Sequence, residues 1–115
     1  VEVNGWIVDS AFTVTFDPKH EILLKAMKEA TDTGVKNAAI DQDINDWAKD
    51  IYEVITSYEV DDKPITPISQ LGGHNILHKK IHGGVFLPSV PKSYINNKFK
   101  PGDLSKANLA TFVGV

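Results

Sequence analysis

An alternating apolar pattern near the N-terminus, closed by an Asp-Pro pair, constrains the fold of this chain most. One face of residues 6–16 is nearly apolar and consists of Trp6, Val8, Ser10, Phe12, Val14 and Phe16. A period of two is typical of a half-buried strand. Asn4-Gly5, just before it, is a type I′ hairpin signal. Asp17-Pro18, just after it, is a typical helix start. The sequence therefore predicts a strand over 6–16 that leads into a helix.

Helical spacing follows in two segments. In the first, Leu23, Met27 and Ala30 recur at helical intervals, and Gly34 is a plausible C-terminal stop. The second segment has the clearest pattern in the chain, a single apolar stripe made of Ile44, Trp47, Ala48, Ile51, Val54 and Ile55. Asp41 or Asp43 could cap its start. Both helices are expected to pack against a sheet.

The rest of the chain is predicted to be mostly extended. A strand over 57–60 ends in an Asp-Asp-Lys-Pro turn, and the two prolines within 64–71 predict an edge strand or an extended loop. Residues 85–94 are extended, and a last apolar strand is expected near 109–115. The predicted fold class is therefore α+β, an antiparallel sheet with two covering helices, within one segment spanning residues 1–115.

Composition excludes several classes of function. The 115 residues are 42% hydrophobic and 23% charged, which are ordinary globular values. A net charge of -3 and no basic stripe make nucleic acid and anionic membranes poor candidates as partners. There is no cysteine for a thiolate metal site, and no apolar run or signal-peptide pattern that would indicate a membrane or a secretory route. Because the chain begins with Val1, we expect it to be processed or to be a piece of something longer.

Three of the four histidines, His74, His78 and His82, lie between two glycine pairs. On a helix they would share a face, but Asn75 stands where a zincin motif needs glutamate, and the glycines leave a helix too short to be stable alone. On a strand, neighbouring histidines would lie about 13 Å apart. Neither arrangement lets the three share one ion, so a metal site here must recruit residues from elsewhere in the sequence.

Asp9 is the natural candidate for such a second ligand. A carboxylate in an otherwise apolar strand is costly to bury unless it is paired or metal-bound. An aspartate on one strand and a histidine on another form an ordinary ligand pair for a divalent ion. The alternative, that these are simply polar residues on a half-exposed strand, stays open on spacing alone. His20, in the first turn of a helix, is expected to be exposed.

Several segments, taken in order, resemble the type 2 methionine aminopeptidases. They are Asn4-Gly-Trp-Ile-Val-Asp-Ser-Ala-Phe-Thr-Val-Thr-Phe16, the following helix 17–34, Ser57-Tyr-Glu-Val60, Pro67-Ile-Ser-Gln-Leu-Gly-Gly-His74, and Ile81-His82-Gly83 followed by Pro88. The resemblance covers residues 1–91 well and 92–115 weakly, so the chain looks like a fragment. It implies part of a pita-bread fold and a dinuclear metalloaminopeptidase, an enzyme that removes the initiator methionine from nascent proteins.

The resemblance also implies roles for particular residues. In the family, two divalent ions (Co, Mn, Fe or Zn) are held by two aspartates, one histidine and two glutamates. Asp9 would be the aspartate that bridges both ions, and His74 would be the single histidine ligand. His82 would be catalytic, lying beside the metals and holding the substrate and the tetrahedral intermediate. Ile81 would line the pocket for the methionine side chain.

Departures from the family pattern bear on activity. Ala110 stands where a glutamate ligand is expected, and alanine cannot bind metal. The first aspartate would precede Val1 and the last glutamate would follow Val115, so only two of the five ligands are present. We therefore expect the isolated chain to be inactive and to bind divalent metal weakly or not at all. Exposed sheet edges are expected to favour self-association.

Three hypotheses of function follow. In the first, the chain is a segment of a cytoplasmic aminopeptidase whose partners are nascent polypeptide N-termini and the ribosome, without direct nucleic-acid or membrane contact. In the second, it is a catalytically dead pita-bread homologue that acts as a protein- or ribosome-binding module. Ala110 favours the second, whereas the retention of Asp9, His74 and His82 favours the first. A small stand-alone domain that only shares descent is a third possibility.

Overall fold

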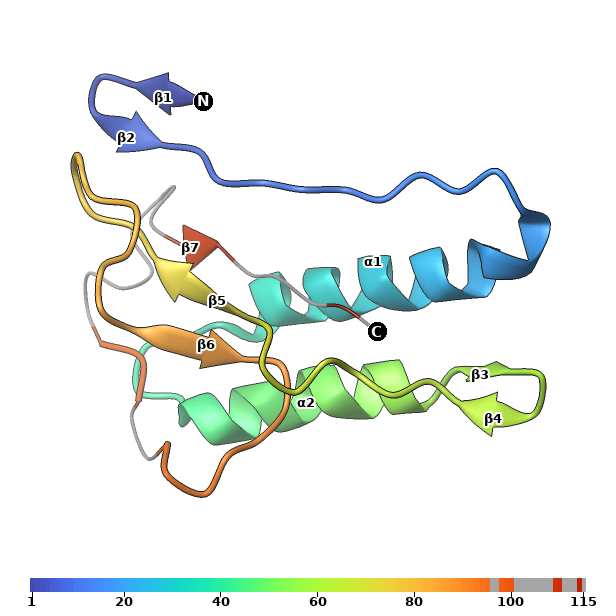
Figure 1. Cartoon of the computed structure of the whole chain (residues 1–115). Helices are drawn as coiled ribbons and strands as arrows, with labels where there is room; N and C mark the ends of the chain where they lie inside the picture. Colours follow the sequence, from blue (N-terminus) through green and yellow to red (C-terminus); the bar gives the residue numbers. More distant parts are fainter. Residues whose placement is uncertain (96–97, 101–108, 111–113, 115) are drawn as a thin grey trace.

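Two helices and a set of short antiparallel strands make up the molecule, in a computed structural model that describes residues 1–95, 98–100, 109–110 and 114 (Figure 1). In chain order the elements are β1 (Glu2–Val3), β2 (Trp6–Ile7), η1 (Pro18–His20), α1 (Glu21–Asn37), α2 (Ile44–Thr56), β3 (Glu59–Val60), β4 (Lys63–Pro64), β5 (Gly72–Asn75), β6 (Phe86–Pro88) and β7 (Leu109–Ala110). The predicted α+β class is confirmed.

The first helix begins as the sequence predicts and ends later. The Asp17 carboxylate accepts a hydrogen bond from the Lys19 N–H at 3.0 Å, and one turn of 3₁₀ helix (η1) leads into α1. The predicted stop at Gly34 is wrong, because α1 continues to Asn37. Gly34 is instead buried, and its carbonyl accepts a hydrogen bond from Trp47 Nε1 at 2.8 Å. Gly34 therefore lies inside α1 where the Trp47 side chain of α2 contacts it, and it does not end the helix.

The second helix matches its prediction closely. Asp43 is the N-cap, and its carboxylate accepts hydrogen bonds from the N–H groups of Asn45 and Asp46. Nearly all of the predicted stripe is fully buried, and the core between α1 and α2 consists of Ala26, Ala30, Ile44, Trp47, Ala48, Ile51, Ile55, Ile65, Leu87 and Phe99. No helix in the described part of the chain is long and apolar enough to cross a membrane.

The strands form three separate small sheets rather than the single covered sheet that the sequence predicts. β1 and β2 form a hairpin, β3 and β4 form another, and the third sheet has the order β6-β5-β7, all antiparallel. Both hairpin turns have the expected left-handed residues, with φ of 53° and 85° at Asn4 and Gly5, and 51° and 62° at Asp61 and Asp62. The helices pack mainly on each other, and β6 adds Leu87 to the core.

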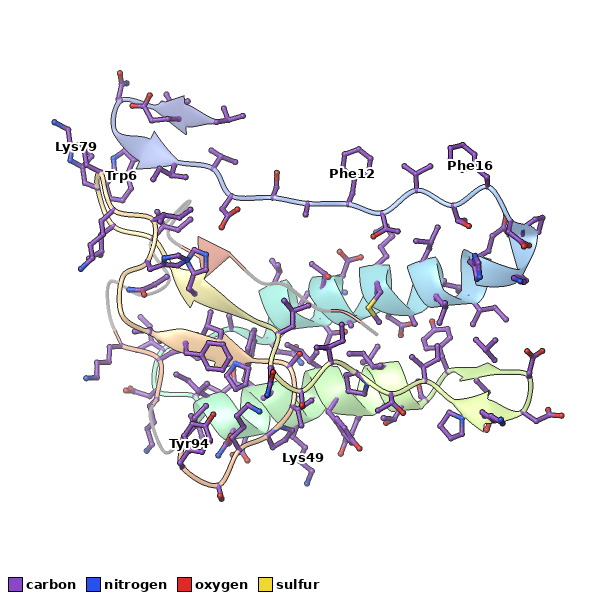
Figure 2. The ribbon with its side chains drawn as sticks, in the orientation of Figure 1. Trp6, Phe12, Phe16, Lys49, Lys79 and Tyr94 are labelled. Atoms are coloured by element: carbon purple, nitrogen blue, oxygen red, sulfur yellow. The ribbon has the colours of Figure 1, made fainter. Side chains whose placement is uncertain are left out.

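The strand predicted over 6–16 is wrong beyond Ile7. Residues 8–15 are extended but belong to no strand, and they cross above α1 to η1 (Figure 1). Two residues of the predicted apolar face, Phe12 and Phe16, point away from α1 and are 90% and 98% exposed (Figure 2). A strand requires a neighbour for its backbone, and no described residue forms a ladder with this segment. The period of two is real, but it does not correspond to a buried face here.

Candidate metal and substrate site

Asp9 and His74 lie against each other although 65 residues separate them in the sequence. The distance from Asp9 Oδ2 to His74 Nε2 is 3.0 Å, and the two side chains are 28% and 13% exposed. His74 comes from the central strand β5, while Asp9 follows the end of β2. Two segments that are distant in the sequence therefore bring a carboxylate and an imidazole into contact at one partly buried place.

The orientation of His74 is fixed by its second ring nitrogen. Nδ1 lies 3.0 Å from the carbonyl oxygen of Asn75, an acceptor only, so Nδ1 carries the hydrogen and donates it. Nε2 then faces the Asp9 carboxylate, a second acceptor. With Nδ1 as the donor to Asn75, Nε2 would carry the lone pair that a metal ion uses, beside the Asp9 carboxylate. Metal-binding histidines are typically held in this way, with the outer ring N–H donated to a carbonyl.

His82 lies directly beside His74. Their ring centroids are 4.6 Å apart with an interplanar angle of 69°. The predictions that treated 74–82 as one helix or one strand are both wrong. β5 ends at Asn75, the chain reverses through the Leu77–Lys80 bridge, and Gly83 N–H donates to the carbonyl of Asn75 at 2.9 Å. This reversal brings His82 back beside the end of β5, next to His74.

Two further predicted positions lie around this point. Ile81, next to His82 in the chain, is 37% exposed. Ala110 is the pairing partner of His74 across the β5–β7 ladder, as Leu109 is of Asn75. Directly opposed residues of an antiparallel pair share a face of the sheet. Position 110 therefore lies directly across the ladder from His74.

His78 contacts the N-terminal hairpin, which the sequence did not indicate. Its Nε2–H donates to the carbonyl of Asn4 at 2.8 Å, and its ring lies 5.3 Å from the Trp6 ring. The next residue, Lys79, donates its N–H to the Gly5 carbonyl at 2.6 Å, and Figure 2 shows Lys79 beside Trp6. These contacts fasten the N-terminal hairpin, and hence Asp9, to the turn after β5. The resemblance assigns no role to His78, and only its position in the reversal reveals these contacts.

The donor types fit one divalent ion, but the set is incomplete. Two ligands of a tetrahedral ion with bonds of about 2.0–2.1 Å lie roughly 3.3 Å apart, close to the observed separation of Asp9 and His74. Among the described residues no third aspartate, glutamate, cysteine or histidine completes a group that could hold a metal. The described part of the chain thus brings two possible metal donors and one neighbouring histidine to this point.

Comparison with known proteins agrees with the motifs. No protein-family model matches the chain. It is 46% identical over 108 residues to methionine aminopeptidase 2-2 of Aspergillus flavus, covering 90% of the chain and 23% of that protein. It is 49% identical over 108 residues to methionine aminopeptidase 2-1 of Chaetomium globosum, covering 90% and 24%. Over 95 residues it is 55% identical to methionine aminopeptidase 2 of Debaryomyces hansenii, covering 79% and 23%. The chain thus spans about a quarter of the curated relatives it matches.

Proposed function

We propose that this chain, which belongs to the methionine aminopeptidase 2 family and matches one segment of it, supplies two metal ligands and a substrate-facing histidine to such an enzyme. The single observation that carries the proposal is the 3.0 Å contact between Asp9 Oδ2 and His74 Nε2, with the His82 ring beside it. The parent activity is removal of the N-terminal methionine from nascent proteins. The segment would then be part of a pita-bread domain.

The residues of this chain have distinct roles in the proposal. Asp9 and His74 hold divalent metal, and the Asn75 carbonyl keeps the lone pair of His74 Nε2 directed at the ion. When bound, the metal supplies Lewis-acid polarisation of the scissile carbonyl and a water of lowered pKa. His82, which is exposed beside Asp9 and His74, can donate a hydrogen bond to the carbonyl oxygen of the substrate. Ile81 lines the pocket for the methionine side chain. Nascent chains at the ribosome, in the cytoplasm, are the proposed partners.

The 115-residue chain by itself is proposed to be inactive. Ala110 occupies the position paired with His74, where a glutamate would bring a third donor to the site. Alanine has no donor, and two ligands from a protein rarely hold an ion tightly. Calorimetry of the isolated chain with Mn²⁺ or Co²⁺ is expected to show weak binding or none. Tight, stoichiometric binding of two ions would contradict this proposal.

Restoring a carboxylate at position 110 tests the proposed site directly. Ala110→Glu is expected to tighten Mn²⁺ binding by roughly tenfold or more, the lower bound of what even outer-shell partners contribute to metal affinity. Ala110→Gln is the matched control, because the amide has the same size but no charge. The double variant Asp9→Asn with Ala110→Glu should lose the gain, because the new ligand needs Asp9 and His74 as partners.

The outcomes of this series are separable by isothermal calorimetry. A gain in Ala110→Glu that disappears with Asp9→Asn supports the assignment of Asp9 as a ligand. An equal gain in Ala110→Gln, or a gain that survives Asp9→Asn, would place the bound ion elsewhere. No gain in any variant would argue that position 110 does not face the site.

Ala110 also favours a second candidate function, a non-catalytic homologue that binds proteins or the ribosome. A binding module has no need of Asp9 or His74, so the double variant Asp9→Asn, His74→Ala should leave its partner binding unchanged. Co-sedimentation of the chain with purified ribosomes measures this. Undiminished binding by the double variant would support the binding module, whereas absence of binding in the unmodified chain would leave the aminopeptidase segment as the better proposal.

A further inference from the structure

Asn75 is a buried polar residue beside the site, and the proposed chemistry uses its backbone carbonyl but not its side chain. It is buried, with 6% of its surface exposed, directly after His74 at the end of β5. Its Oδ1 accepts a hydrogen bond from Val85 N–H at 2.9 Å. Its backbone carbonyl lies at 2.9 Å from Gly83 N and at 3.0 Å from His74 Nδ1.

These contacts surround His82 in the chain. Gly83 follows His82 immediately and is bound to the Asn75 carbonyl, and Val85, two residues further, is bound to the Asn75 side chain. The reversal that starts at Ile76 is thus closed at its far end by one residue. The hydrogen bonds of Gly83 and Val85 to Asn75 therefore determine where His82 lies relative to His74.

Close packing strengthens the same connection. A Cβ added at Gly83 would lie 2.4 Å from Asn75 Nδ2 and 2.5 Å from its Cγ and Oδ1. The Asn75 amide therefore fills the space beside the Gly83 α-carbon, and no larger residue fits at 83 while the amide stays in place. The backbone next to His82 is held both by hydrogen bonding and by contact with the amide.

We propose that Asn75 is a positioning residue that holds the His82 ring against His74. The inference rests on the proposed function only in that His82 faces substrate; the positioning itself concerns the geometry of the two rings. Asn75 acts through the backbone of 83–85 and need not touch substrate or metal. Without its side chain, the amide of Val85 loses its acceptor and the segment that carries His82 loses one of its two attachments.

The test is NMR of the full 115-residue chain, with the nuclear Overhauser effect between the His74 and His82 ring protons as the readout. Asn75→Ala is expected to lose this effect while the core signals of Trp47 persist. Asn75→Asp should retain it, because a carboxylate oxygen can accept from Val85 N–H. Ser89→Ala is the matched control: Ser89 is as deeply buried, and its Oγ–H donates to the Leu71 carbonyl at 3.0 Å, away from His82.

If Asn75→Ala does not fold, Gly83→Ala gives an independent test, because its added methyl group would push against the Asn75 amide and should also abolish the ring contact. Retention of the ring contact in folded Asn75→Ala or Gly83→Ala would overturn the proposal. So would an equal loss in Ser89→Ala, which would mean general loosening of the sheet. Because no metal is present in the measurement, these results are independent of whether Asp9 and His74 bind an ion.

Discussion

The helix pair and the N-terminal segment 8–16 both carry clear apolar periodicity, and they end in opposite environments. In α2, Trp47 and Ile51 are completely buried, whereas in the N-terminal segment Phe12 and Phe16 are 90% and 98% exposed. Both patterns are recognisable in the sequence, although that of α2 is the clearer, since Ser10 interrupts the N-terminal one. Periodicity therefore indicates which side chains share a face, but burial of that face depends on a partner element that the pattern does not contain.

The partners differ in a way that explains the contrast. The stripe of α2 meets α1 along its length, and Trp47 adds an edge-on contact with Phe99, at 5.6 Å between ring centroids, and the hydrogen bond to Gly34. Near one end of segment 8–16, His78 and Lys79 contact the N-terminal hairpin; its other end leads into the Asp17 cap of η1. Stability should therefore lie in the helix pair, and the N-terminal segment should contribute little.

The largest expected effect is in the helix pair. Trp47→Ala removes a fully buried indole and its hydrogen bond to the Gly34 carbonyl, and we expect a loss of about 3–5 kcal/mol in the free energy of unfolding. Urea denaturation followed by circular dichroism measures it. Tyr52→Ala, on the exposed side of α2, is the control and should cost far less. Comparable losses at the two positions would contradict the contrast between buried and exposed faces.

An intermediate effect is expected where the two regions are joined. His78→Ala removes the hydrogen bond to Asn4 and the contact with Trp6, and should cost about 1 kcal/mol. Its more informative result is local: amide exchange over residues 2–9 should rise while exchange in α2 stays unchanged. Equal loss of protection in both regions would show that the N-terminal hairpin is part of the cooperative core, which would contradict the expectation that stability lies in the helix pair.

The smallest effect on stability is expected on the exposed row. The double variant Phe12→Ser, Phe16→Ser should change the free energy of unfolding by only about 0.5 kcal/mol or less, as is usual for surface positions. It should nevertheless lower self-association of the isolated chain, because exposed apolar rows favour it. Sedimentation velocity over a range of concentrations measures this, with Tyr94→Ser, exposed outside the row, as control. Unchanged association in the double variant would exclude this row as the contact.

Much of the local structure could be predicted from the sequence because it depends on local chemistry. Asn4-Gly5 forms its turn through left-handed backbone angles, and the Asp43 side chain accepts from the N–H groups of Asn45 and Asp46. The errors have a common cause. Helix α1 continues past Gly34, where Trp47 of α2 contacts it. Segment 8–16 forms no strand because no described strand lies beside it to pair with its backbone. Both outcomes depend on tertiary neighbours that no local pattern specifies.

The candidate site was predictable by a different route. Spacing alone indicated that the three histidines could not share an ion and that Asp9 was an unusual residue. Residue chemistry suggested Asp9 as a ligand together with one of the histidines, and only the resemblance singled out His74; the 3.0 Å contact is consistent with that assignment. The closeness of His74 and His82 was not predictable from spacing, because it depends on the reversal closed by Asn75. The contacts of His78 and Asn75 could not be predicted either, because their side chains bind backbone groups of other segments, those of Asn4 and Val85.

The central claim, that Asp9 and His74 form one metal-binding point, is tested most directly by titrating the ¹⁵N-labelled chain with substoichiometric Mn²⁺. Paramagnetic broadening reports where even a weakly bound ion resides. We predict that the signals of Asp9, His74 and His82 broaden first, while those of His20 in η1 and of the acidic start of α2 at Asp43 and Asp46 stay sharp. Broadening that begins at the start of α2, or that spreads evenly over the exposed carboxylates, would contradict the claim.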